Sequence, residues 1–181
     1  MNLVNISEPN KKKSTNILCL GIDFGTTNSV CSVKIDEKII YIKDLKKKKL
    51  IPSIVLFKNQ KVYIGNQIKN SSISELIFSV KRFFTDNPDQ IIFSQGLNKK
   101  TAIDVSKEIF SYIKNLSQDY LKQTIDDCVL TVPAYFDEKA RSGIMRAAFL
   151  AGFNVRRLIN EPTAACLLYT SPSTRDRISS R

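Results

Sequence analysis

The chain has 181 residues, of which 43% are hydrophobic and 25% are charged, the proportions of a globular protein with one domain or a domain plus a lobe. This composition excludes a collagen-like repeat, a coiled coil and disorder throughout. The apolar runs stop short of the ~18 residues that a membrane helix needs. The first residues also lack the apolar stretch of a secretory signal. We therefore expect a cytoplasmic protein with no membrane partner.

The net charge is +11, from 28 basic and 17 acidic residues. Much of the excess lies in two lysine runs, 11–13 and 46–49, and neither has the interleaved aromatic residues of a base-stacking platform. We interpret both runs as solvated charged segments and expect no nucleic-acid partner. A basic nucleic-acid-binding module stays open as an alternative, which predicts a steep salt dependence of DNA or RNA affinity.

Histidine is absent, which excludes histidine-based catalysis. The cysteines form no CxxC pair, so a zinc site would need all of the scattered thiols. We expect no such site. The prediction is reduced and mostly buried thiols at Cys19, Cys31, Cys128 and Cys166.

The first half of the chain is predicted to be rich in strands. Residues 1–16 are polar and are predicted to form a flexible leader. Five segments then have the composition or the period of strands: 17–22, 29–35, 38–44, 50–57 and 61–65. The first three have short connections and predict an antiparallel meander, and Pro52 places the fourth near a sheet edge. From 66 to 103 the pattern is weak.

The second half alternates helices and strands. The order is helix, strand, helix, strand and helix, at 104–123, 128–132, 138–151, 153–159 and from Glu161 onward. Asp104 and Asp137 are the predicted N-caps of the first two helices, and Gly152 ends the second. One stripe of the first helix is apolar: Val105, Ile109, Ile113, Leu116 and Tyr120. The alternation predicts an α/β domain with a mixed sheet.

The segment GIDFGTTNS (21–29) has the features of a phosphate-binding turn. Gly25 lets the backbone approach a ligand closely, and Asp23 ends a buried strand where a carboxylate can hold Mg²⁺ directly or through water. Successive N–H groups and side-chain donors follow at Thr26, Thr27 and Asn28. A Walker A loop would carry a lysine and open a helix, whereas this segment opens a strand. An ordinary glycine turn with threonine caps is the alternative.

Two further charged residues are candidates for chemistry. Lys81, in SVKR, could stabilise a transferring phosphoryl group, or it could be a solvated surface lysine. Glu161, in NEPTAA, could position a water or complete a metal shell, or it could simply favour the start of a helix.

Five segments in this order resemble the seventy-kilodalton heat-shock chaperones of the DnaK type over residues 17–165: GIDFGTTNS, IPSIVLF, SVKR, VPAYFDEKAR and AGFNVRRLINEPTAA. The resemblance implies an actin-like (ribonuclease H-like) ATPase fold of which this chain supplies the first lobe. That lobe would have a mixed five-stranded sheet with helices and a small α+β insert. The expected core is 17–52 with 104–165, and the inserted outer subdomain is 53–103.

The resemblance also implies that ATP and Mg²⁺ are the cofactors. Asp23 would belong to the water shell of the Mg²⁺ ion, and Thr26 would lie near the γ-phosphate. Lys81 and Glu161 would position the attacking water. The phosphates would be lined by Gly25, Thr26, Thr27 and Asn28. The reaction would be in-line phosphoryl transfer to water, which depends on positioning and electrostatics.

Pro133 and Arg141 would form the relay that reports the nucleotide state to a peptide-binding part. Four segments resemble the HscA-like chaperones of iron–sulfur cluster assembly more than general DnaK: SVKR, ARSGI, AAFLAG and RRLINEPTAA. That branch implies a client that is an iron–sulfur scaffold protein and a dedicated J-domain cochaperone. A general protein-folding chaperone is the alternative, and so is a small-molecule kinase of the same superfamily, against which VPAYF and NEPTAA argue.

Two features depart from the family pattern. After Lys81-Arg82 and an apolar pair the family usually has Gly-Arg, but this chain has Thr85-Asp86. The segment between Lys81 and the helix predicted at 104 is also short, which implies a trimmed outer subdomain. After Ala165 the family continues with small residues, but this chain continues CLLYTSPSTRDRISSR. We hypothesise that 166–181 is a non-native tail on a truncated chaperone, which would bind nucleotide weakly and hydrolyse almost none alone.

Overall fold

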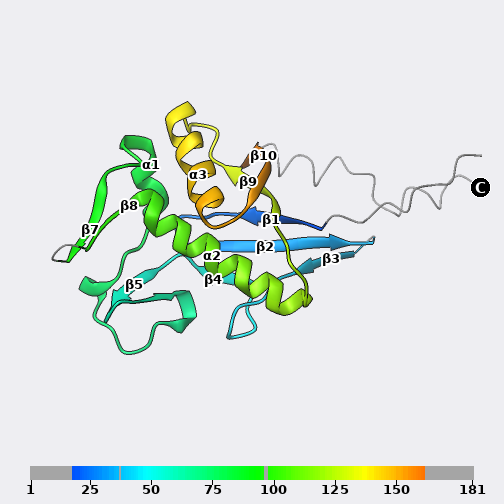
Figure 1. Cartoon of the computed structure of the whole chain (residues 1–181), viewed down its shortest axis with the longest axis horizontal. Coiled ribbons are helices and arrows are strands. Elements are labelled where there is room, and N and C mark those ends of the chain that lie inside the picture. Colours follow the sequence, from blue (N-terminus) through cyan, green and yellow to red (C-terminus); the bar gives the residue numbers. More distant parts are fainter. Residues whose placement is uncertain (1–17, 37, 96–97, 162–181) are drawn as a thin grey trace, which may run out of the picture.

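The computed structural model describes residues 18–161 apart from 37 and 96–97 (Figure 1). The predicted leader at 1–16 and the predicted tail at 166–181 lie outside this part of the chain. So does Cys166, and so does the helix expected after Glu161.

The main sheet is mixed, as the sequence predicts. Its path β10-β9-β1-β2-β3 joins β1 (Cys19–Asp23), β2 (Asn28–Ile35), β3 (Lys38–Tyr41), β9 (Asp127–Val132) and β10 (Asn154–Asn160). Strands β1, β2 and β3 form an antiparallel meander, which confirms that prediction. Strands β1, β9 and β10 run parallel to one another. A short strand, β4 (Leu50–Pro52), also pairs with β2, beside β3 at the outer edge of the sheet.

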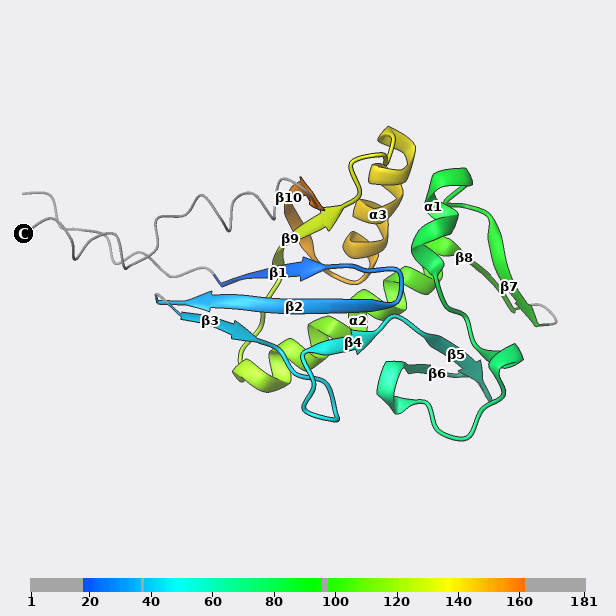
Figure 2. The ribbon, with the colours of Figure 1, turned by 180° about the vertical axis from the view of Figure 1, so that it is seen from behind.

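Two helices enclose the core against the sheet. Helix α2 (Ala102–Leu121) crosses one face and packs against α3 (Glu138–Leu150), as Figure 1 and the reverse view in Figure 2 show. One continuous apolar cluster includes Leu20 of β1, Leu130 of β9, Ile113 of α2 and Ala147 of α3. None of the described helices is long and apolar enough to cross a bilayer.

Helix α3 ends where the sequence predicts. Asp137 is its N-cap and accepts a hydrogen bond from the Ala140 N–H at 2.8 Å. Gly152 follows the helix with a φ of 84°, a left-handed conformation that glycine adopts without strain.

Helix α2 begins two residues earlier than predicted, and Asp104 is not its N-cap. Thr101 is the N-cap: its hydroxyl accepts the Asp104 N–H at 3.1 Å, while the Asp104 carboxylate accepts the Thr101 N–H at 2.9 Å. This reciprocal capping box satisfies two N–H groups that the helix start leaves free. The prediction was wrong because a threonine and an aspartate at this spacing can each cap alone, but here they act together.

The predicted single strand at 50–57 is two strands. The chain leaves the main sheet after β4 and forms β5 (Val55–Lys58), which pairs with β6 (Lys61–Ile64). The break is fixed at Ser53, whose N–H donates to the Thr27 carbonyl at 2.9 Å and whose buried hydroxyl lies 2.9 Å from that of Ser29. These bonds to the distant β1–β2 hairpin turn the backbone, and a local apolar pattern cannot reveal them.

The segment with a weak pattern folds into short elements: η1 (Gly65–Gln67), η2 (Ile73–Glu75), η3 (Val80–Arg82), α1 (Phe83–Asp86), β7 (Ile91–Gln95) and β8 (Asn98–Thr101). The β7–β8 hairpin contacts the β5–β6 hairpin through Phe93 and Phe57, whose ring centroids are 5.0 Å apart. Val55 and Val80 belong to the same apolar cluster as the main sheet. The short elements are therefore fastened directly to the core.

Candidate functional site

The candidate site lies at the carboxyl ends of the parallel strands, which is where open α/β sheets commonly bind ligands. Asp23 is the last residue of β1, and its side chain is exposed. The hydroxyl of Thr131, in the neighbouring strand β9, donates a hydrogen bond to Asp23 Oδ1 at 2.6 Å. This bond fixes the carboxylate while its second oxygen has no partner among the described residues.

The turn between β1 and β2 requires the glycine that the sequence singled out. A Cβ atom at Gly25 would lie 2.0 Å from the Asn28 carbonyl oxygen, an overlap that no side chain permits. Phe24 packs the turn against the core, because its side chain is fully buried and its ring centroid lies 4.9 Å from that of Phe110 in α2. The Thr27 carbonyl is held by Ser53 N, so the turn is fastened at both ends.

Lys81 and Glu161 form an ion pair in which Lys81 Nζ lies 2.6 Å from Glu161 Oε1. The lysine side chain is 4% exposed, whereas that of the glutamate is 43% exposed. The structure therefore rejects the interpretation of Lys81 as a solvated surface residue. It also places the Lys81 ammonium 6.0 Å from the Phe24 ring centroid, which brings it beside the phosphate-binding turn.

The short helix η3 holds Lys81 in this place. Ser79 precedes it with a φ of 56°, a left-handed conformation that turns the chain sharply inward. Val80 and Phe84, on either side of Lys81, are buried in the core, and their packing fixes the position of the segment. Glu161 follows β10 directly, and the neighbouring residue Asn160 pairs with Val132 of β9.

Pro133 and Arg141 lie at the same end of the sheet. Pro133 is buried directly after β9, and its carbonyl accepts the Phe136 N–H at 3.2 Å. The Arg141 guanidinium, on α3, donates to the Phe136 carbonyl at 2.9 Å and to Asn160 Oδ1 at 2.7 Å. Arg141 thus connects helix α3 to the residue that precedes Glu161.

The arrangement suits an anion with a hard cation. The described residues include no cluster of three or more His, Cys, Asp or Glu side chains. The single fixed carboxylate of Asp23 nevertheless fits Mg²⁺, which is commonly held by one or two carboxylates together with water and substrate phosphates. Backbone N–H groups of the turn and the ammonium of Lys81 supply positive charge nearby.

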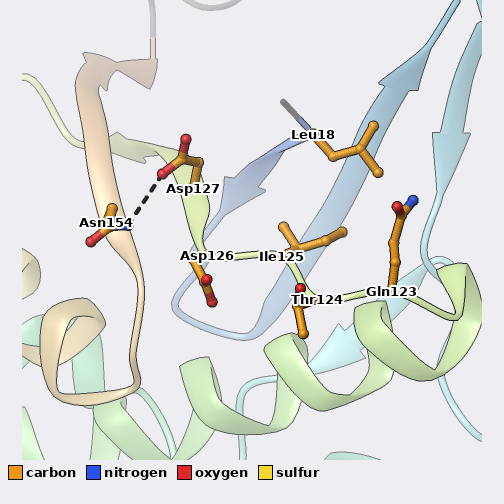
Figure 3. Close-up of a pocket in the computed structure, with 7 residues that line it drawn as sticks. All are labelled: Leu18, Gln123, Thr124, Ile125, Asp126, Asp127 and Asn154. Atoms are coloured by element: carbon orange, nitrogen blue, oxygen red, sulfur yellow. Dashed lines mark hydrogen bonds between the residues drawn. The ribbon is translucent and has the colours of Figure 1, made fainter. Parts of the chain in front are cut away.

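A separate hollow lies at the opposite end of the same strands, where β9 and β10 begin (Figure 3). It is lined by Leu18, Gln123, Thr124, Ile125, Asp126, Asp127 and Asn154. Its acidic groups are already paired: Asp127 contacts Arg156 at 2.9 Å, and Asp126 contacts Lys114 at 2.8 Å. The hydrogen bond from Arg156 holds the pKa of the Asp127 carboxyl below its ordinary value. The hollow lies at the opposite end of the strands from Asp23 and is therefore separate from the candidate site.

Sequence reasoning missed three residues that organise the site. Thr131 was noted only as part of a strand, although it fixes Asp23. Asn160 and Phe136 were noted only as parts of motifs, although both accept a hydrogen bond from the Arg141 guanidinium. For Thr131 the available signal was a hydroxyl near the carboxyl end of a predicted buried strand.

Comparison with known proteins agrees with the resemblance that the sequence motifs indicate. The family model described as Hsp70 protein matches residues 19–177. The chain is 37% identical over 185 residues to the chaperone protein HscA homolog of Rickettsia prowazekii, a match that covers 93% of this chain and 31% of the relative. The HscA homologs of Rickettsia felis and Rickettsia typhi are 35% and 37% identical, with 93% of this chain covered in both matches. The chain spans 29% and 32% of these two relatives.

Proposed function

The chain belongs to the Hsp70 protein family, and we propose that it forms the nucleotide-binding first lobe of a chaperone that hydrolyses ATP to drive the binding and release of client polypeptides. Its mixed sheet and helices are those of the first lobe of the actin-like ATPase fold of this family. The observation that carries the proposal is the Lys81–Glu161 pair beside the glycine turn, since a buried ammonium held by a partly exposed carboxylate is poised for a phosphate.

The roles of the side chains follow from their chemistry. The turn at Gly25 with Thr26, Thr27 and Asn28 would line the phosphates through N–H and hydroxyl donors. The Lys81 ammonium would stabilise the charge on the transferring phosphoryl group, while the Glu161 carboxylate would orient the attacking water. Mg²⁺ would neutralise charge on the phosphate oxygens, and Asp23 would hold it through water.

We further propose that Pro133 and Arg141 transmit the nucleotide state, because Arg141 joins helix α3 to the strand that ends beside Glu161. The relatives are named HscA homologs, which supports a role in iron–sulfur cluster biogenesis. On this proposal the partners are a J-domain cochaperone and an iron–sulfur scaffold protein as client, in the cytoplasm. A general protein-folding chaperone is the alternative within the family.

The ATPase proposal can be tested in a graft, because the chain spans less than a third of its relatives. Residues 19–161 would replace the matching segment of the Rickettsia prowazekii HscA homolog. We expect Mg²⁺-dependent hydrolysis of ATP with no added acceptor in single-turnover experiments. The substitution Lys81→Met should lower that rate by about 10²–10³-fold, whereas Lys61→Met, at an exposed lysine of β6, should not change it.

A graft that binds ATP but hydrolyses it equally well with Met at position 81 would contradict the role of Lys81. Turnover that requires a small-molecule acceptor would instead favour the kinase alternative.

The branch of the family needs a second test. The HscA graft would be expressed in a bacterium that lacks its own HscA homolog, and the activity of an iron–sulfur enzyme would be measured. The same residues would be grafted into a general DnaK-type chaperone and tested for refolding of a denatured protein. Rescue of the iron–sulfur enzyme, with weak refolding by the second graft, is the expected result. The reverse pattern would favour the general chaperone.

A further inference from the structure

Strand β3 ends the main sheet with an open edge. It is the last strand on the path, and its backbone makes no hydrogen bond on the outer side within the described residues. Ile42 N donates inward to the Cys31 carbonyl at 2.9 Å, so the alternation of a strand turns the N–H groups of Ile39 and Tyr41 outward. Figure 2 shows β3 lying along the outer side of β2. An extended peptide could therefore pair with this edge.

The edge also presents apolar side chains to solvent. Ile39 is 58% exposed and Tyr41 is 39% exposed, and their spacing of two places both on one face of the strand. A bound strand would bring its own alternate side chains against this face, as cross-strand pairs do.

A rigid group of lysines adjoins the edge. We call residues 42–49, which connect β3 to β4, the lysine loop (Figure 2). The buried Asp44 carboxylate accepts the N–H groups of Lys46 and Lys48, each at 2.8 Å, and the side-chain amide of Asn66. Asp44 N also donates to the Lys48 carbonyl at 2.9 Å, which closes the loop. The loop is therefore held in one shape, which reduces the entropy lost on binding.

The charges of this loop are available to a ligand. Lys43 and Lys46–Lys49 are exposed, and none of them forms an ion pair with any residue that the structure describes. The Asp44 carboxylate is already occupied by its three donors. Lys49 Nζ lies 4.3 Å from the Tyr41 ring centroid, which joins the loop to the strand edge.

We propose that the β3 edge and the lysine loop together bind an extended acidic segment of a partner protein, which adds a strand to the sheet. Main-chain pairing would supply the geometry, the exposed Ile39 and Tyr41 would contact its apolar residues, and the lysine loop would select its carboxylates. A nucleic acid fits less well, because Lys49 covers one face of the exposed ring and the apolar side chains would have no counterpart.

The test uses the 181-residue chain and a fluorescein-labelled decapeptide of alternating glutamate and valine, with binding followed by fluorescence anisotropy. We expect saturable binding that weakens as salt is added. A glutamine–valine decapeptide should bind about tenfold more weakly or worse. A glutamate–valine peptide that is N-methylated at alternate residues should lose binding, because it keeps the charge but cannot pair.

Two variants of equal net charge separate the site from charge alone. Replacement of Lys46–Lys49 by glutamine should weaken binding about tenfold. Replacement of four exposed lysines elsewhere by glutamine should leave it unchanged: Lys61, Lys69, Lys99 and Lys139. Circular dichroism would confirm that both variants are folded.

Equal weakening in both variants, or full binding of the N-methylated peptide, would overturn the proposal. So would stronger binding to phosphatidylglycerol vesicles or to polyuridylate than to the acidic peptide. Absence of any peptide binding would show that the lysines instead protect an exposed edge from pairing, as charged residues on edge strands do.

Discussion

Lys81 Nζ lies 2.6 Å from Glu161 Oε1, and this bond joins positions 80 residues apart in the chain. One partner sits on the η3 segment and the other directly follows the last strand of the sheet. The pair therefore fastens the short elements between β6 and α2 to the end of the sheet that carries Asp23. The same contact has a structural role and a role in the proposed hydrolysis.

The two partners differ in burial, so their removal should have unequal effects on stability. Glu161→Ala removes the carboxylate partner of Lys81, whose side chain is only 4% exposed. We expect a loss of about 1–3 kcal/mol in the free energy of unfolding. Lys81→Met leaves a glutamate that water can reach and fills the same space, so the change should stay within about 1 kcal/mol. Urea denaturation would measure both, and equal losses would contradict the asymmetry.

The turn that follows β1 should tolerate only glycine at position 25. Gly25→Ala places a Cβ 2.0 Å from the Asn28 carbonyl, so the backbone of the turn must move. We expect a loss of about 1–3 kcal/mol in stability, measured by urea denaturation. Gly21→Ala is the control in β1, the strand that leads into the turn, since its Cβ would meet Ser32 Oγ at 3.5 Å and the Ser32 carbonyl oxygen at 3.8 Å, both ordinary contacts. That change should be neutral or stabilise by up to about 1 kcal/mol. Similar costs at both positions would refute the steric argument.

Much of the fold follows from local pattern. The strands at β1, β2 and β9 are short apolar or alternating runs, and the structure buries many of their hydrophobic residues: Leu20, Ile22, Cys31, Val33, Cys128, Leu130 and Val132. Helix α3 has both of its ends marked, by Asp137 and Gly152, and the structure places both as predicted. The mixed sheet then follows from the order of elements, because each helix between strands returns the chain to a parallel neighbour.

The contacts that assemble the site do not follow from local pattern. The break at Ser53 depends on Thr27 and Ser29, which lie more than twenty residues earlier in the chain. The burial of Lys81 depends on Glu161, and nothing in the residues around Lys81 marks it as buried. In the segment 66–103 the elements are too short for a period to be visible, and their packing against the core determines them.

Two buried thiols should make the protein less stable in alkali. Desolvation raises the pKa of the Cys31 thiol, and that of Cys128, to about 12 from an ordinary 9.0. The unfolded chain therefore releases these protons at lower pH than the folded chain does, so stability falls as pH rises from about 9 to about 12. Urea denaturation across this range should show a decline that is shallower in the Cys31→Ala and Cys128→Ala variants. An identical slope in the variants would contradict this origin.

The same burial should protect both thiols from alkylation. At pH 8 the folded protein should keep Cys31 and Cys128 unmodified by iodoacetamide, because only the thiolate reacts. The half-buried Cys19 is the internal comparison, and its thiol should be alkylated faster than the two buried thiols. Mass spectrometry of peptides would locate the label. Rapid labelling of the two buried thiols without unfolding would contradict their packing.

Gly143 should resist a substitution that normally stabilises helices. Replacing glycine by alanine inside a helix gains about 1 kcal/mol. At this position, however, a Cβ would lie 2.8 Å from Pro88 Cβ and 3.0 Å from Phe84 Cδ1, both rigid rings. We expect the overpacking to outweigh the gain in helix propensity, with a net loss of about 1–3 kcal/mol in the free energy of unfolding measured by urea denaturation. Ser142→Ala, on the exposed side of the same helix, should cost nothing. The cycle with Pro88→Gly decides the cause: with that ring removed, Gly143→Ala should cost markedly less. An unchanged cost would place the strain elsewhere. A relieved cost would show that the segment from α1, which begins two residues beyond Lys81, to Pro88 packs directly against α3.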